Sequence, residues 1–267
     1  MWCADFKGWF FTGDGQRCDP LTISDASSRY LLRCQATEGT DVAAVQPVFE
    51  AAFKEYGLPW AIRTDNGPPF ASRALCGLSR LSLWWLKLGI VPERIKAGHP
   101  EQNGRHERMH LTLKKETATP PAATRLAQQR RFKRFVRQFN EERPHEALEM
   151  ATPASAYRVS QRPYPRRLEE WDYPTGMKVR QVSNGGRFRW RCAQVFLTHV
   201  LEGERVGLWP VDERYWQVWI GALDLGILDG YRQTMLTPSQ RKRMEEEGRL
   251  FCPGAFRYAP GPRAGET

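Results

Sequence analysis

The stretch that decides the fold is WAIRTDNG, from Trp60 to Gly67. Its first part, WAIRT, is short and mostly apolar, which is typical of a buried strand, and Asn66-Gly67 is typical of a turn. Asp65 lies between the two, at the end of the strand. The stretch therefore predicts a buried strand that presents one acidic side chain at the edge of a sheet.

The chain before this strand predicts an antiparallel meander and a helix. Three short strands separated by tight turns are expected at Trp2–Phe11, Leu21–Asp25 and Tyr30–Gln35. The segment Asp41–Tyr56 has apolar residues at helical spacing, and Gly57 directly after it is typical of a helix end. The strand WAIRT then joins the sheet that the meander begins.

The chain after WAIRT continues the alternation of helices and strands. We predict a helix at Leu75–Leu88, a strand at Gly89–Ile95, a helix opened by Pro100 and a basic helix at Arg125–Asn140. This order of elements is typical of an α/β fold with a mixed sheet, here of five strands.

The composition changes after this α/β core, which we place at residues 1–158. Residues 159–176 are rich in proline and charge, which indicates an extended linker. From 177 to 230, short alternating strands predict a small all-β barrel, and residues 231–267 are expected to form a basic, partly disordered tail.

The overall charge of the chain indicates a polyanionic partner. Its 267 residues carry a net charge of +10, and each contact with a phosphate would release condensed counterions. No apolar run approaches the roughly 20 residues of a membrane span. Asp5 and Lys7 interrupt the apolar stretch that a signal peptide needs, so we expect a cytoplasmic protein. The six cysteines include no C-x-x-C pair, which favours reduced thiols over disulfides or a zinc knuckle.

The pentapeptide HERMH, His106–His110, has the spacing H-E-x-x-H that zinc proteases use on a helix. Other features of the stretch disagree with a zinc site. Arg108 stands between the glutamate and the second histidine, Arg105 adds a positive charge beside the first one, and no third ligand follows at helical distance. Two solvated histidines on a basic helix are a simpler interpretation, and Glu107 then needs another role.

Asp5, Asp65 and Glu107 can meet at one point of such a fold. Asp5 lies within the first strand, Asp65 ends a neighbouring strand, and Glu107 is near the start of a helix that crosses the sheet edge. Three carboxylates repel one another unless cations neutralise them, and hard oxygen ligands suit Mg²⁺ or Mn²⁺, with room for two ions about 4 Å apart. Taken singly, the same residues could instead be a turn acid, a helix N-cap and one half of an ion pair.

Three sequence blocks resemble a known family. They are W-x-x-D-F-K-G at Trp2–Gly8, T-D-N-G at Thr64–Gly67 and H-P-x-x-N-G-x-x-E-R-x-H at His99–His110. They look like the three blocks of the DDE transposases of bacterial insertion sequences, whose catalytic core is similar to retroviral integrase and has the ribonuclease H-like fold. ISDASSRYL at Ile23–Leu31 and the segment Asn140–Tyr157 also look like that family, so the resemblance extends through the α/β core.

The resemblance implies that Asp5, Asp65 and Glu107 are the catalytic, metal-binding residues of a DDE transposase that uses Mg²⁺ or Mn²⁺. The implied reaction is attack of water on a phosphodiester at the end of a donor element, and then attack of the freed 3′-hydroxyl on target DNA. Lys114 follows Glu107 by seven positions and therefore shares its helix face. The residues expected to bind DNA around this site are Lys114, His110, Arg105 and Asn66.

Two departures from the family leave other functions open. The gap between Asp65 and Glu107 is longer than the family's usual spacing, and no helix-turn-helix region precedes the first strand. The expected partners are element ends, target DNA and further copies of the chain, with a helix-turn-helix module in a longer or separate chain. Without it, we expect poor discrimination between element ends and other DNA. A DNA-binding remnant or regulator of a transposase, and a metal-dependent nuclease on the same fold, are the alternatives.

The segment RFRWRC in the predicted barrel alternates arginine with aromatic residues. Period-two geometry sends Arg187, Arg189 and Arg191 to one face of a strand. The same geometry sends Phe188 and Trp190 to the other face, so a basic surface would lie over an aromatic core. We expect this surface to bind DNA without sequence preference. A polar strand face with no partner is the alternative.

Overall fold

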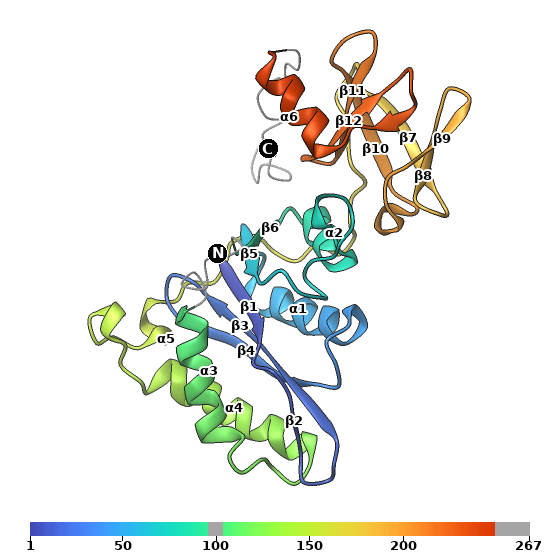
Figure 1. The fold of residues 1–267 in the computed structure, drawn as a ribbon. Coiled ribbons are helices and arrows are strands. Elements are labelled where there is room, and N and C mark those ends of the chain that lie inside the picture. Colours follow the sequence, from blue (N-terminus) through green and yellow to red (C-terminus); the bar gives the residue numbers. More distant parts are fainter. Residues whose placement is uncertain (96–103, 249–267) are drawn as a thin grey trace. The chain divides into compact units, whose positions relative to one another are not determined.

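The computed structural model describes the backbone of residues 1–95 and 104–248, and the side chains of residues 1–95 and 108–248. Figure 1 shows the fold as a ribbon. The chain divides into two compact units. Unit 1 contains Met1–Ser72 and Arg80–Arg166, and unit 2 contains Arg73–Ser79 and the chain from Arg167 onward.

Unit 1 is built on a mixed sheet. Its strands are β1 (Trp2–Phe6), β2 (Phe10–Phe11), β3 (Arg17–Asp25), β4 (Leu31–Thr37), β5 (Ala61–Thr64) and β6 (Val91–Arg94). The strand order is β2-β3-β1-β5-β6, and β4 pairs with β3. The pairs β1–β3 and β3–β4 are antiparallel, whereas β1–β5 and β5–β6 are parallel. The first strand is therefore central and WAIRT is its neighbour, as the sequence predicts.

The beginning of the chain differs from the prediction in one respect. The single strand predicted at Trp2–Phe11 is wrong, because the chain leaves the sheet after β1 and Gly8 adopts a positive φ of 92°. Glycine tolerates this conformation since it has no Cβ. The chain then returns as β2, where Phe10 pairs with Cys18 at the start of β3. The sheet consequently has six strands where five were expected.

The helices of unit 1 are α1 (Val42–Tyr56), α2 (Arg80–Lys87), α3 (Gly104–Thr117), α4 (Arg125–Glu141) and α5 (Pro153–Ala156). Helix α1 has the predicted ends, with the Asp41 carboxylate accepting a hydrogen bond from the Ala44 amide and Gly57 at a φ of 72° after the last turn. The predicted start of α3 at Pro100 lies outside the described residues.

The helix predicted at Leu75–Leu88 is wrong over its first part. A short 3-10 helix at Leu75–Gly77 precedes α2, and Cys76 has a left-handed backbone with a φ of 54°. That conformation cannot continue into an α-helix, so α2 starts only at Arg80. The apolar spacing that predicted one helix comes from two separate elements.

Helices cover both faces of the sheet, which is the middle of three layers (Figure 1). On one face, Ala4 of β1 packs in a cluster with α1 and α2. On the other face, Met109 and Leu113 of α3 and Phe132 of α4 pack against β3 and β4. Because side chains alternate along a strand, Asp5, which follows Ala4, points to the α3 side.

Amide side chains of α4 bind the outer edge of strand β4. Asn140 accepts a hydrogen bond from the Leu31 amide at 2.8 Å and donates one to the Leu31 carbonyl at 3.0 Å. Gln129 makes the same kind of contact with the Ala36 amide and the Cys34 carbonyl. An edge strand leaves backbone groups without a strand partner, and buried groups of this kind need hydrogen bonds. These contacts hold α4, and the α3–α4 side of the core, on the sheet.

Unit 2 contains an antiparallel sheet in the order β13-β12-β11-β10-β7-β8-β9. The bounds are β7 (Lys178–Ser183), β8 (Arg187–Trp190), β9 (Ala193–Phe196), β10 (Arg205–Pro210), β11 (Tyr215–Ile220), β12 (Leu223–Asp229) and β13 (Thr234–Met235). The two end strands, β13 and β9, are in contact, so the sheet nearly closes into a barrel. The predicted α/β fold, a mixed sheet with helices and then a small all-β barrel, is confirmed in these features.

Two details of unit 2 were not predicted. Among the expected short strands, β9 ends at Phe196 and a 3-10 helix follows at His199–Leu201. The expected tail contains helix α6 (Pro238–Glu246), which begins at Thr237 with a capping box and buries Met244 against the sheet. The expectation of disorder beyond 248 lies outside the described residues, and the domain boundaries at 158, 176 and 230 stay predictions.

No helix among the described residues is long and apolar enough to span a bilayer.

Candidate active site

Asp5 lies in β1 on the sheet face that α3 covers. Its cross-strand partner in β3 is Thr22, and directly opposed residues on antiparallel strands have their side chains on the same face. The Asp5 side chain is 15% exposed, whereas Thr22 is fully buried. The carboxylate is therefore at the border between the core and the solvent.

His110 of α3 connects the helix to both of these residues. Its Nε2 atom lies 2.7 Å from the Thr22 hydroxyl, and its Nδ1 atom lies 3.9 Å from Oδ2 of Asp5. The Thr22 hydroxyl in turn donates a hydrogen bond of 3.0 Å to the backbone carbonyl of Asp5. The imidazole is buried, so α3 contacts the first carboxylate through a polar link inside the core.

Asp65 follows β5 directly and is a neighbour of Asp5 by strand register. Strands β1 and β5 run parallel, with Trp2 opposite Ile62. Continued past Cys3–Arg63 to the first residue after β5, this register would bring Asp5 opposite Asp65. Laterally paired residues point to the same face, and neighbouring strands are about 4.8 Å apart. The register of the two strands is compatible with neighbouring carboxylates, and their meeting stays a prediction.

The turn after β5 is held by side-chain hydrogen bonds. The Gly67 amide donates to Oδ1 of Asp65 at 3.2 Å, which is the local bond that acidic residues commonly make in turns. The Asn66 side-chain amide donates to the Ile95 carbonyl at 3.0 Å, just after β6. Asp65 and Asn66 are both exposed. The turn consequently presents the Asp65 carboxylate at the surface of the sheet edge.

Glu107 lies in the first turns of α3, three residues before His110. Residues three apart share a helix face. Its position on the helix is therefore on the face that carries His110 toward Asp5. The side chain of Glu107 is outside the described part of the structure, so the meeting of all three carboxylates stays a prediction.

The chemistry of the two described carboxylates fits a hard divalent cation. Carboxylate oxygens are the ligands that Mg²⁺ and Mn²⁺ prefer, and neither Asp5 nor Asp65 is closed off from solvent. Among the described side chains, no group of three His, Cys, Asp or Glu residues is placed to hold a metal ion. The third ligand of the predicted site, Glu107, is not among those side chains.

The residues predicted to bind DNA near the carboxylates have different surroundings. Lys114 is exposed on α3, so its ammonium can reach a phosphate. The side chain of Arg105 lies outside the described residues. His110 is buried, and the direct phosphate contact expected for it does not fit, because the imidazole is enclosed between Thr22 and Asp5. That enclosure also disagrees with the alternative of a solvated histidine or a zinc ligand at this position.

The arginine-rich strand of the barrel has the predicted alternation. In β8, Arg187 and Arg189 are exposed, while Phe188 and Trp190 are buried. Arg191 is exposed as well, but it follows the end of β8 in a turn with a φ of 52°. The basic surface over an aromatic core is therefore present, whereas its contact with DNA stays a prediction.

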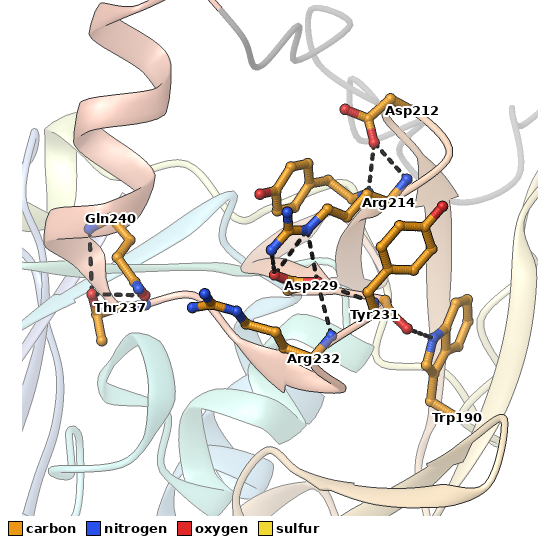
Figure 2. Close-up of polar contacts among 10 residues, drawn as sticks. Trp190, Asp212, Arg214, Asp229, Tyr231, Arg232, Thr237 and Gln240 are labelled. Carbon is orange, nitrogen blue, oxygen red and sulfur yellow. Dashed lines mark hydrogen bonds and ion pairs between the residues drawn. The ribbon is translucent and has the colours of Figure 1, made fainter.

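Unit 2 also contains a buried acidic residue that sequence reasoning missed (Figure 2). Asp229 at the end of β12 accepts hydrogen bonds from the Arg214 guanidinium, with the shortest at 2.5 Å, and from the backbone amides of Tyr231 and Arg232 at 3.0 Å. The nearby Trp190 indole donates to the Gly230 carbonyl at 3.3 Å. The bonds from Arg214 hold the pKa of the Asp229 carboxyl below its usual value. Arg214 is 15 residues before Asp229 in the chain, so this pair depends on the pairing of β11 with β12 and is not part of a local motif.

The α/β core is similar to known families and proteins. The family described as Integrase core domain matches residues 1–100 with one profile and residues 88–153 with another. Among solved structures, the HTLV-2 integrase catalytic core domain in complex with magnesium aligns with 58% of this chain and 93% of that chain, at 15% identity and a TM-score of 0.45.

Two relatives come from bacterial insertion elements. An uncharacterized 31.7 kDa protein of insertion element IS407 from Burkholderia multivorans is 31% identical over 155 residues, which is 58% of this chain and 53% of that protein. An uncharacterized 39.2 kDa protein of insertion element IS476 from Xanthomonas euvesicatoria is 30% identical over 164 residues, 60% of this chain and 45% of that protein. The matches span about half the length of these relatives. Residues 1–153 match the integrase core domain family, and the chain is similar to proteins of bacterial insertion elements.

Proposed function

We propose that this protein is a transposase that cleaves DNA at element ends and joins those ends to target DNA. The observation that carries the proposal is the placement of Asp5 in β1, on the sheet face crossed by α3, and of Asp65 directly after β5, the parallel neighbour of β1. Glu107 lies on that helix, on the face that carries His110 to Asp5. The match of residues 1–153 to the integrase core domain family supports this assignment.

In this proposal, Asp5, Asp65 and Glu107 hold Mg²⁺ or Mn²⁺, as two ions. When bound, the ions would stabilise the negative charge that develops on the phosphate and the leaving oxygen. The polypeptide itself supplies the fixed carboxylates, on strands whose positions are set by the two apolar layers. It also supplies the exposed ammonium of Lys114, which would hold a DNA phosphate close to the site.

A strand-transfer assay with pre-cleaved element ends, target DNA and Mn²⁺ tests the function directly. The neighbouring DNA of the coding sequence provides the candidate ends. We expect joined products that contain both DNAs. Cleavage without joining would identify a nuclease, and DNA binding without either reaction would identify a remnant or regulator of a transposase. Either of these two results contradicts the proposal.

The barrel is expected to contribute affinity without sequence preference. Replacing Arg187, Arg189 and Arg191 together by Gln should weaken binding by similar factors for all DNA sequences. Because up to three phosphate contacts disappear, the slope of log affinity against log salt should flatten by up to about 3 units. Binding is measured by fluorescence anisotropy of labelled duplexes between low and physiological salt.

The control for this experiment changes the same charge elsewhere. Arg130, Arg134 and Arg137 are exposed on α4 in unit 1, and their replacement by Gln removes three charges as well. We expect a smaller change of the salt slope in that variant. Equal slopes for the two variants would mean that only the net charge matters, and an unchanged slope for the barrel variant would remove the barrel from the interface.

A further inference from the structure

We propose that Thr22 and His110 form a positioning pair for the Asp5 carboxylate. The inference rests on the proposed function, since it concerns the same site. Thr22 is in β3, His110 is in α3 and Asp5 is in β1, so the pair joins three elements at one point. Neither residue is assigned to metal binding, and both act on the reaction through Asp5.

The direction of the hydrogen bonds follows from the chemistry of the hydroxyl group. A threonine hydroxyl has one proton, and a backbone carbonyl can only accept. The Thr22 hydroxyl donates its proton to the Asp5 carbonyl at 3.0 Å. It must then accept from His110 at 2.7 Å, which requires a proton on Nε2 of the imidazole. The chain His110–Thr22–Asp5 is therefore a directed set of bonds that fixes the orientation of the ring.

The fixed ring is also next to the carboxylate itself. Nδ1 of His110 is 3.9 Å from Oδ2 of Asp5, and only 5% of the histidine side chain is exposed. At that distance the ring does not make a hydrogen bond to Oδ2, but it lies beside the carboxylate. The same pair thus binds the backbone carbonyl of Asp5 through Thr22 and lies beside its carboxylate through His110.

A purely structural role would not need this chemistry. Helix α3 packs on the sheet mainly through apolar residues, including Met109 and Leu113. A buried hydroxyl and imidazole cost desolvation energy that an apolar pair of similar size would not. Groups that orient metal ligands typically change metal affinity or activity by about 10–100-fold when they are removed. That range sets the expected size of the effect here.

The test compares variants that remove or keep the hydrogen bonds at constant shape. Thr22→Val removes the hydroxyl, and Thr22→Ser keeps it. His110→Phe removes both ring nitrogens, and His110→Gln keeps a donor near the position of Nε2. Two quantities are measured on the full chain: the strand-transfer rate, and the affinity for Mn²⁺ alone without DNA, by electron paramagnetic resonance of the unbound ion. Thermal unfolding confirms that each variant is folded.

We expect Thr22→Val and His110→Phe to lower both quantities by about 10–100-fold. Thr22→Ser and His110→Gln should recover most of that loss. The matched control is Thr112→Val, since Thr112 is in the same helix and its hydroxyl donates to the Arg108 carbonyl, away from Asp5. This control should leave the rate and the Mn²⁺ affinity unchanged.

Two outcomes would overturn the inference without touching the proposed function. In the first, Thr22→Val and His110→Phe lower the unfolding temperature but leave Mn²⁺ affinity and rate unchanged. In the second, Thr22→Ser loses as much as Thr22→Val. The proposed function fails by a different result, namely the absence of strand-transfer products with the unsubstituted protein, whereas the Mn²⁺ affinities of the variants still test the positioning pair. The two failures are therefore distinguishable.

Discussion

Asp5→Asn, Asp65→Asn and Glu107→Gln are each expected to lower the rate of DNA strand transfer by at least about a thousandfold, which corresponds to about 4 kcal/mol of transition-state stabilisation. Each change replaces a charged oxygen ligand by a neutral amide of almost the same shape. The loss should therefore fall on metal binding and on the chemical step, and DNA affinity measured without divalent ions should stay nearly constant.

Matched controls make this expectation specific. Glu116→Gln is the same substitution in the same helix, where Glu116 is exposed and pairs with Arg143. Asp41→Asn keeps a good N-cap for α1, since Asn and Asp cap helices about equally well. Both controls should retain full activity. Near-normal strand transfer by Glu107→Gln would show that the third carboxylate is wrongly assigned.

Removal of metal ions distinguishes a carboxylate site for Mg²⁺ or Mn²⁺ from the zinc site of a protease. A general chelator such as EDTA should stop strand transfer, and added Mg²⁺ or Mn²⁺ should restore it. A chelator selective for Zn²⁺ should have no effect, because the expected ligands are all carboxylates. Restoration by Zn²⁺ alone would favour the H-E-x-x-H interpretation of His106–His110.

Asp229→Ala is expected to lower the local stability of the barrel by about 3 kcal/mol. Asp229 is 1% exposed and accepts bonds from Arg214 and from the amides of Tyr231 and Arg232 (Figure 2). Removing it leaves the amides of Tyr231 and Arg232 and the Arg214 guanidinium without their shared buried acceptor, and unpaired donors are costly. The Arg214 side chain is 37% exposed, so water can solvate part of its charge.

Hydrogen–deuterium exchange on the full chain measures this loss where it occurs. The free energy of opening should fall for amides of β11 and β12, and amides of the unit 1 sheet serve as an internal reference. Asp212→Ala is the matched control, because the Asp212 carboxylate also accepts from two backbone amides, at 2.7 Å, but is exposed. Water can replace an exposed acceptor, so the control should lose much less. Equal losses would contradict the role given to burial.

The same network predicts a dependence of barrel stability on pH. The pKa of Asp229 is lowered in the folded protein, mainly by the hydrogen bond from Arg214. A lowered carboxyl pKa contributes stability that is complete above the unfolded value near 4 and is lost as the pH falls through the folded value. Protection of β11 and β12 should therefore decrease below about pH 4, and Asp229→Ala should lack that decrease.

The architecture could be predicted from local patterns where those patterns extend over whole elements. The apolar spacing of Asp41–Tyr56 and the glycine after it define α1 nearly to the residue. The pattern failed at Trp2–Phe11 and Leu75–Leu88, where Gly8 and Cys76 adopt positive φ values. Hydrophobic period and composition are properties of the side chains. They do not indicate where one residue adopts a positive φ and the backbone changes direction. Both errors therefore lie at breaks within elements.

The candidate site also has a part that the sequence could predict and a part that it could not. Asp5, Asp65 and Glu107 could be named from the sequence because each belongs to a short block with a recognisable pattern. The burial of His110 could not, because it depends on the pairing of Asp5 with Thr22 and on the face of the sheet that α3 covers. An imidazole on a basic helix is expected to face solvent until the helix has been placed.

By itself, the sequence determined the order and type of most elements, the basic charge, the alternating face of β8 and the resemblance to insertion-element transposases. These properties are local, because they follow from hydrophobic period, from turn residues and from short motifs. Only the tertiary structure decided which residues meet across strands: Asp5 with Thr22 and His110, and Asp229 with Arg214. Such contacts join residues that are far apart in the chain, and strand register and helix packing set them. Neither strand register nor helix packing can be inferred from one segment of the sequence alone.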